Sequence, residues 1–179
     1  MCFNITFVDF TILLMRKIYQ MKITIVCVGK IKEKFYRDAI DEYAKRLSKY
    51  CKFEIIEVPD EKTPDKCSET EEQMILSKEA EKILKNIRQD MFVYALAIKG
   101  KKLDSVAFAN EIHRLGLSGK SSIAFVIGGS LGLHSSVLKR ADRQLSFSDM
   151  TFPHQLMRVI LSEQIYRSFR IIAKEPYHK

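Results

Sequence analysis

The chain has 179 residues, of which 46% are hydrophobic and 29% charged, so it is long enough and apolar enough for one domain with a buried core. It contains no compositionally biased tract, which excludes fibrous and disordered classes. The net charge of +8 is unevenly placed, because residues 53–72 hold eight acids and two bases, net −6, which leaves +14 on the remainder. Basic charge concentrated in this way favours an RNA or DNA partner.

Three groups of basic residues can neutralise the phosphates of a nucleic acid. Each group alone is commonly a solvated face, but together, beside glycine-rich loops, they strengthen the expectation of a nucleic-acid partner. The groups are Lys30, Lys32, Lys34 and Arg37; Lys99, Lys101 and Lys102; and Lys139, Arg140 and Arg143.

The N-terminal region contains an apolar run from Phe3 to Met15 that does not fit a targeting segment. The run is too short to span a bilayer, Arg16 and Lys17 follow it instead of preceding it, and no small-residue cleavage site is present. We therefore expect no membrane partner. Residues 1–20 are predicted to be an extension without a functional role, and residues 21–179 a single domain.

The cysteines predict neither a metal site nor a disulfide framework. Cys2, Cys27, Cys51 and Cys67 are widely separated, without a Cys-x-x-Cys pair or a histidine placed as a zinc ligand. Cys27 falls within an apolar strand. Reduced, partly buried thiols of this kind are expected in a cytoplasmic protein.

The first half of the chain predicts alternating strands and helices. Residues 22–28 have the pattern of a strand, and apolar residues at helical spacing follow from 40 to 47. Residues 53–58 form the next predicted strand, which Pro59 ends, and residues 60–68 are expected to be a mobile polar loop.

The second helix should begin at Ser68, because Glu71 three residues later completes a capping box. A continuous apolar run from 91 to 98 then predicts a central strand, and residues 99–102 a basic exit loop. Ser105 is the predicted N-cap of the next helix.

The remainder of the chain carries most of the recognisable chemistry. The apolar strand 123–127 leads into glycines at 128, 129 and 132, and a short helix capped by Ser135 or Ser136 is expected to run to Arg140. Residues 144–147 form the last predicted strand, and a long helix is expected from Gln155 to Ala173.

Five strands alternating with helices predict an α/β fold, with a mainly parallel sheet covered by helices on both faces. The last helix is apolar around most of its circumference, so it requires two burial surfaces. A homodimer partner would supply the second.

The glycines do not match known nucleotide-binding patterns. Gly128-Gly129-Ser130 lacks the dinucleotide spacing, and Gly100 lacks the flanking residues of a triphosphate-binding loop. The glycine loop and the loop 147–152, each following a strand, instead predict two walls of one pocket.

The motifs MKITIVCVGKIKEKFY, VIGGSLGLH, LSFSDMTFPHQLMRVILSEQIYR and EPYHK resemble the ribosomal RNA large subunit methyltransferase H family, over residues 21–179. The resemblance implies a SPOUT fold whose C-terminal part, from about Ile123 onward, forms a trefoil knot, and a homodimer. It also implies methylation of N3 of a pseudouridine in 23S ribosomal RNA, on the assembled ribosome, with S-adenosylmethionine as methyl donor. The alternative is a non-catalytic RNA-binding or ribosome-associated module with the same fold.

The resemblance also assigns the residues of the cofactor pocket. Contacts through backbone groups and apolar packing are implied, and glycine allows the backbone to come close to a ligand. The implied cofactor residues are Leu96, Gly128, Phe147, Ser148, Asp149, Met150, Thr151 and Phe152.

Methyl transfer from a sulfonium needs no metal, but it needs an aligned acceptor and a deprotonated nitrogen. His154, Tyr177 and His178 are the groups available to orient the base or take its proton, and Arg158 could bind phosphate or stabilise charge on the ring. We expect the last three residues to project from the core after Pro176. The family lends this tail to the active site of the partner.

Overall fold

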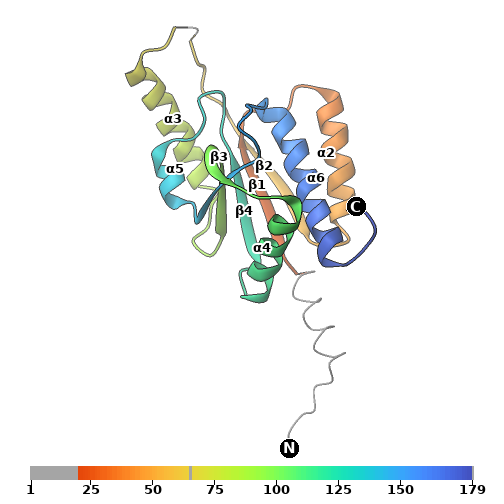
Figure 1. The fold of residues 1–179 in the computed structure, drawn as a ribbon. Helices are drawn as coiled ribbons and strands as arrows, with labels where there is room; N and C mark the ends of the chain where they lie inside the picture. Colours follow the sequence, from red (N-terminus) through yellow and green to blue (C-terminus); the bar gives the residue numbers. More distant parts are fainter. Residues whose placement is uncertain (1–19, 65, 179) are drawn as a thin grey trace, which may run out of the picture.

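The computed structural model describes residues 20–64 and 66–178 of the protein. It is an α/β structure with one five-stranded parallel sheet, ordered β2-β1-β4-β3-β5, between two layers of helices (Figure 1). The elements in chain order are β1 (Lys22–Val28), α2 (Lys34–Leu47), β2 (Lys52–Val58), α3 (Glu69–Leu84), β3 (Phe92–Lys102), α4 (Ser105–Leu117), β4 (Ser122–Ile127), α5 (Ser135–Arg140), β5 (Arg143–Ser146) and α6 (His154–Ile172).

The central strands β1 and β4 are buried on both faces, and the alternation of their side chains divides the core in two. Ile25 and Phe125 belong to the core beneath α2, α4 and α6, whereas Val26 and Val126 belong to the core beneath α3 and α5. Each aliphatic side chain removed from water in this way contributes about 1.5–3 kcal/mol, which explains why residues 123–127 of β4 form an unbroken apolar run.

The predicted strand and helix pattern is confirmed, with corrections at three N-termini. The capping box of α3 is present, because the Glu71 N–H donates to Ser68 Oγ at 3.3 Å and the Ser68 N–H donates to Glu71 Oε2 at 2.9 Å. Ser105 is not the cap of α4, however, since Asp104 precedes it and accepts from the Ala107 N–H at 2.7 Å. His134 caps α5 in place of Ser135 or Ser136, and the C-terminal helix begins at His154, one residue earlier than predicted.

The basic exit loop predicted at residues 99–102 is part of β3 instead. This strand pairs with β5 on both sides of an irregularity, since Leu96 and Lys101 both face Leu145. A Cβ atom at Gly100 would lie 2.7 Å from the Leu145 carbonyl carbon, so only glycine allows the two backbones to pass this closely. The sequence predicted this glycine in an exit loop, whereas it permits a bulge within the strand.

The prediction for residues 1–20 lies outside the described residues, except for Gln20. Over the ranges 20–64 and 66–178, no helix has both the length and the apolar character that crossing a bilayer would require.

Candidate functional site

A cavity of about 290 Å³ opens at the carboxyl ends of β3, β4 and β5. Parallel α/β sheets commonly bind ligands at this edge. Residues 96–98 at the β3 bulge, the glycine loop 128–132 after β4 and residues 147–152 after β5 contribute most of its lining. His154 and Met157, in the first turn of α6, complete it. The pocket predicted between the two loops is therefore present.

The glycine loop folds back tightly on itself. The Gly132 N–H donates to the Gly129 carbonyl at 3.2 Å, and the two residues form an isolated antiparallel bridge. A Cβ atom at Gly128 would lie 2.1 Å from the Gly132 carbonyl oxygen, a distance at which the backbone would have to move. Gly128 is therefore required by the loop itself, which presents bare backbone to the cavity.

The opposite wall is a loop held by its own serines. Ser146 Oγ donates to the Ser148 carbonyl at 3.1 Å, and the Met150 N–H donates to Ser148 Oγ at 3.0 Å. Phe147 and Phe152 pack against the core beneath α6. This wall therefore combines apolar surface with a fixed backbone, which suits a ligand with a flat aromatic part and a polar chain.

Seven of the eight predicted cofactor residues line the cavity, and Asp149 does not. The Asp149 side chain is 82% exposed and pairs with Lys102, so its carboxylate faces solvent. Outside the predicted glycine loop, sequence reasoning missed six lining residues: Ala97, Ile98, Ile127, Leu145, Ser146 and Met157. Five of them adjoin predicted residues in the same segments, and Met157 follows His154 at helical spacing, which was a usable signal.

His154 lies at the start of α6 and on the cavity wall. Burial lowers the pKa of its imidazole below the usual 6.5, and the positive charge of Arg158 lowers it further. The ring is consequently neutral near pH 7, the form that can accept a proton.

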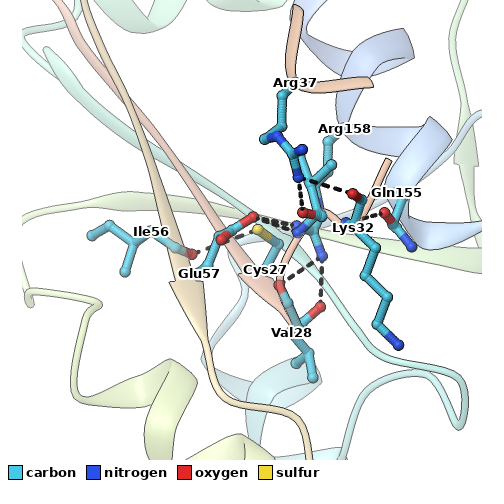
Figure 2. A network of polar contacts seen from close by, with 10 residues as sticks. Cys27, Val28, Lys32, Arg37, Ile56, Glu57, Gln155 and Arg158 are labelled. Atoms are coloured by element: carbon cyan, nitrogen blue, oxygen red, sulfur yellow. Dashed lines mark hydrogen bonds and ion pairs between the residues drawn. The ribbon is translucent and has the colours of Figure 1, made fainter. Parts of the chain in front are cut away.

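Arg158 does not face a substrate, which corrects the role predicted for it. Its side chain is 0% exposed, and its guanidinium donates to the Val28 carbonyl at 2.7 Å, the Gly29 carbonyl at 3.0 Å and Glu57 Oε1 at 2.9 Å (Figure 2). The Arg158 side chain lies beneath the end of β1. Arg158 therefore joins α6 to the carboxyl ends of β1 and β2.

The C-terminal tail packs on its own subunit, contrary to the predicted projection. The chain reverses at Lys174, whose φ of 54° is left-handed, and Glu175 then pairs with Lys49 at 2.9 Å. Tyr177 OH donates to Glu163 Oε1 at 3.1 Å, while its ring lies 5.0 Å from that of Tyr166. The left-handed turn at Lys174 and the ion pair of Glu175 therefore fold the tail back onto the protein, although Pro176 was expected to direct it away from the core.

The tail also lies away from the cavity of its own chain. His178 contacts Arg167, with 3.4 Å between Nδ1 and Nη1. Glu163, the tail contact nearest the start of α6, is nine residues beyond His154, which corresponds to about 13 Å along a helix. The four predicted catalytic residues are therefore not brought together within one chain, and the roles of His154, Tyr177 and His178 remain predictions.

Comparison with known proteins shows which family the chain belongs to. The family model described as "Predicted SPOUT methyltransferase" matches residues 21–178. Relatives named ribosomal RNA large subunit methyltransferase H, from Clostridium botulinum and Bifidobacterium adolescentis, are each 62% identical over 159 residues, covering 89% of this chain and 100% of theirs. The chain belongs to this SPOUT methyltransferase family.

A solved structure supports the fold of this SPOUT methyltransferase. The crystal structure of a probable methyltransferase from Bordetella pertussis Tohama I superposes with a TM-score of 0.54, covering 88% of this chain and 98% of that one. Its sequence identity is 12%, so the likeness concerns the fold alone. Among the described residues of the SPOUT methyltransferase, no group of three or more histidine, cysteine or acidic side chains is arranged to hold a metal ion.

Proposed function

We propose that the protein is an S-adenosylmethionine-dependent methyltransferase that methylates N3 of a pseudouridine in 23S ribosomal RNA on the assembled ribosome. The observation that carries the proposal is the cavity at the carboxyl edge of the sheet, which is walled by VIGGSLGLH and the loop in LSFSDMTFPH. The relatives at about 60% identity are named as methyltransferases of large-subunit ribosomal RNA, and a cytoplasmic location follows from that substrate.

The cavity residues fit the cofactor. When bound, S-adenosylmethionine supplies an activated methyl group on a sulfonium. A glycine loop that a single Cβ atom would distort offers backbone groups to the polar chain of the ligand, and Leu96, Phe147 and Phe152 offer apolar surface to its adenine ring. Ser148, Met150 and Thr151 line the same wall. Asp149 contacts the ligand in this proposal only through its backbone.

On the acceptor side, His154 is the proposed proton acceptor. Its lowered pKa keeps the imidazole neutral, and it stands beside the cavity that would hold the methyl donor. Buried Arg158 acts by positioning, because its hydrogen bonds to Val28 and Gly29 fix the start of α6. In this proposal Arg158 thus helps to position the helix that carries His154, and His154 supplies the base.

The proposal includes a homodimer in which each tail completes the site of the other subunit. Tyr177 and His178 contact Glu163 and Arg167, which are too far along α6 from His154 of the same chain for the tail to reach it. A second copy of the chain is therefore the natural source of these groups. Partly exposed Leu156, Val159 and Ile160 on α6 provide apolar surface for such a partner.

The expected C-terminal trefoil knot also belongs to the proposal. The backbone of β3 at Gly100 passes within contact of β5, and the chain then returns from this edge strand to pack α6 against α2 and α4. In this proposal the C-terminal part is threaded where the chain leaves this edge strand.

The test uses ribosomes from a bacterial strain that lacks its own pseudouridine N3-methyltransferase. The protein and methyl-labelled S-adenosylmethionine should transfer one methyl group per ribosome, and mass spectrometry of ribosomal RNA fragments should place it on N3 of a pseudouridine. RNA binding with no response to S-adenosylmethionine in calorimetry would instead support the non-catalytic module and reject the enzyme.

A further inference from the structure

Some side chains of the three basic groups already have partners within the protein. Arg140 donates to the carbonyls of Arg88 and Met91, Arg143 lies 3.7 Å from Glu111, and Lys102 pairs with Asp149. These charges are partly satisfied inside the protein. Among the described residues, the ammonium groups of Lys99, Lys101 and Lys139 have no such partner, and the same is true of Lys30 and Lys32 in the first group. Lys30 and Lys32 differ from the others because side chains of other elements hold the backbone of their loop.

Lys30 and Lys32 lie in the loop between β1 and α2, and both are exposed. Their neighbours are already engaged, because Lys34 pairs with Asp38 at 2.6 Å and Arg37 donates to the chain itself. Within residues 20–64 and 66–178, neither the Lys30 nor the Lys32 ammonium has a hydrogen bond or an ion pair. Both remain available to a ligand.

The backbone that carries these lysines is held from three directions, as Figure 2 shows. Arg37 Nη1 donates to the carbonyls of Ile31 and Lys32 at 2.8 and 2.9 Å. The Lys32 N–H donates to Gln155 Oε1 on α6 at 2.9 Å, and the Ile31 N–H donates to Glu57 Oε1 on β2 at 3.0 Å.

Glu57 is in turn fixed by buried Arg158, which also binds the carbonyls of Val28 and Gly29 at the start of the loop. Every residue from Val28 to Lys32 except Lys30 therefore has a backbone group held by a side chain of another element. A loop fixed before binding loses little conformational entropy when a ligand arrives.

The loop also borders the cavity. A Cβ atom at Gly29 would lie 4.0 Å from His154 Nε2, and His154 lines the cavity. Gln155, which holds Lys32, is the next residue of α6. The charge of Lys32 is one of the influences that lower the pKa of His154, which is consistent with this proximity.

We propose that Lys30 and Lys32 form a preorganised phosphate-binding site that holds the RNA backbone next to the target nucleotide. The inference rests on the proposed function and assigns the substrate contact within it. Lysine binds phosphate as a point charge, without reading sequence, so the loop would position the RNA while the cavity selects the base. Arg158, through Glu57, Val28 and Gly29, is the internal support of this site.

The test compares two double variants with the same loss of charge. Lys30→Ala/Lys32→Ala removes the proposed site, and Lys52→Ala/Lys120→Ala removes two exposed lysines at the amino ends of β2 and β4, the opposite edge of the sheet. Each full-length variant is assayed with ribosomes at several salt concentrations. Melting temperature and calorimetric affinity for S-adenosylmethionine are measured in parallel.

The loop variant should raise KM for ribosomes about tenfold, leave kcat within about twofold, and reduce the slope of log affinity against log salt by about 2, one for each lost phosphate contact. Cofactor affinity and melting temperature should not change. The control should match the unaltered protein, and Lys30→Arg/Lys32→Arg should retain most of the affinity because it keeps both charges.

Equal KM and equal salt slopes for the loop variant and its control, in an active enzyme, would overturn the assignment. A loss of affinity for ribosomes but not for protein-free ribosomal RNA would also overturn it, since the lysines would then contact a ribosomal protein. Should the unaltered protein transfer no methyl group, the proposed function fails separately, and direct binding of ribosomal RNA still decides the role of the lysines.

Discussion

Arg158 Nη2 lies 2.7 Å from the carbonyl oxygen of Val28, a residue 130 positions earlier in the chain. This hydrogen bond and its neighbours connect the helix that carries His154 to the end of the central strand β1. A guanidinium with 0% exposure is stable only when it is paired and hydrogen-bonded. Substitution of Arg158 therefore tests how far the site depends on this buried hydrogen-bond network.

Arg158→Ala should lower the free energy of unfolding by about 3–5 kcal/mol, because it leaves buried carbonyls without a donor and removes one partner of an ion pair. Urea denaturation measures the change. The matched control is Arg46→Ala, which breaks an exposed ion pair with Glu42 and should cost at most about 1 kcal/mol. Equal losses in the two variants would show that the buried network does not support the fold.

Gly128→Ala should abolish binding of S-adenosylmethionine in calorimetry, because the new Cβ atom would displace the Gly132 carbonyl and with it the glycine loop. The loop shift should also cost about 1–3 kcal/mol of stability, which thermal denaturation would report. Gly119→Asn is the control, since a Cβ atom at Gly119 would have no atom within 4 Å and this glycine precedes the amino end of β4, whereas the cavity is at the carboxyl end. Normal cofactor affinity in Gly128→Ala would remove this loop from the site.

The rate of methyl transfer should stay constant as the pH is lowered to a value below 6.5, and it should then decrease as His154 becomes protonated. The decrease begins below 6.5 because burial and Arg158 lower the pKa of this histidine. The pH dependence of kcat measures this limb. His154→Gln should reduce kcat and remove the limb. An unchanged profile in that variant would exclude His154 as the proton acceptor.

The same histidine should make stability depend on pH. With its pKa lowered in the folded state, the unfolded chain binds more protons between that pKa and 6.5. The contribution of His154 to the free energy of unfolding therefore rises with pH through this window and is constant above it. Urea titrations of the unaltered protein and His154→Gln should differ in slope only within the window.

Deletion of residues 177–179 should reduce methyl transfer steeply while the fold and cofactor binding persist. Because Tyr177 packs on Tyr166 and donates to Glu163, the deletion should also cost some stability. Tyr177→Phe, which removes only the hydroxyl, should cost about 1 kcal/mol by urea denaturation.

Sharing of the tail between subunits is tested with a mixed dimer of a tail-deleted chain and a Gly128→Ala chain. One of the two sites would then combine a sound glycine loop with an intact tail and the other would have neither, so about half of the normal activity per dimer is expected from this pairing. A fully active tail-deleted homodimer would exclude a role for the tail. A correctly assembled but inactive mixed dimer would exclude its transfer to the partner.

Removal of residues 1–20 should leave methyl transfer and melting temperature unchanged, because the family match begins at residue 21. The truncated and full-length proteins are compared in the ribosome assay. Loss of activity in the truncated protein would give the segment a function.

Much of the site could be predicted from local sequence. The run 123–127 ending in glycines, and the serine-rich stretch after Leu145, predict two loops at the ends of neighbouring parallel strands. The capping box at Ser68 and Glu71 is equally local, since both residues lie within one turn. These features depend on a few adjacent residues, which is why seven of the eight predicted cofactor residues line the cavity.

Contacts between distant segments were decided only by the tertiary structure. A polar residue on an amphipathic helix is expected at the surface, yet Arg158 is buried because the ends of β1 and β2 present two carbonyls and a carboxylate to it. Gly100 lies in the β3–β5 pairing rather than in a loop, and Tyr177 folds back onto Glu163. Local patterns specify which strands and helices form, whereas the partner of each polar group depends on which chain segments packing brings together, often more than 100 residues apart.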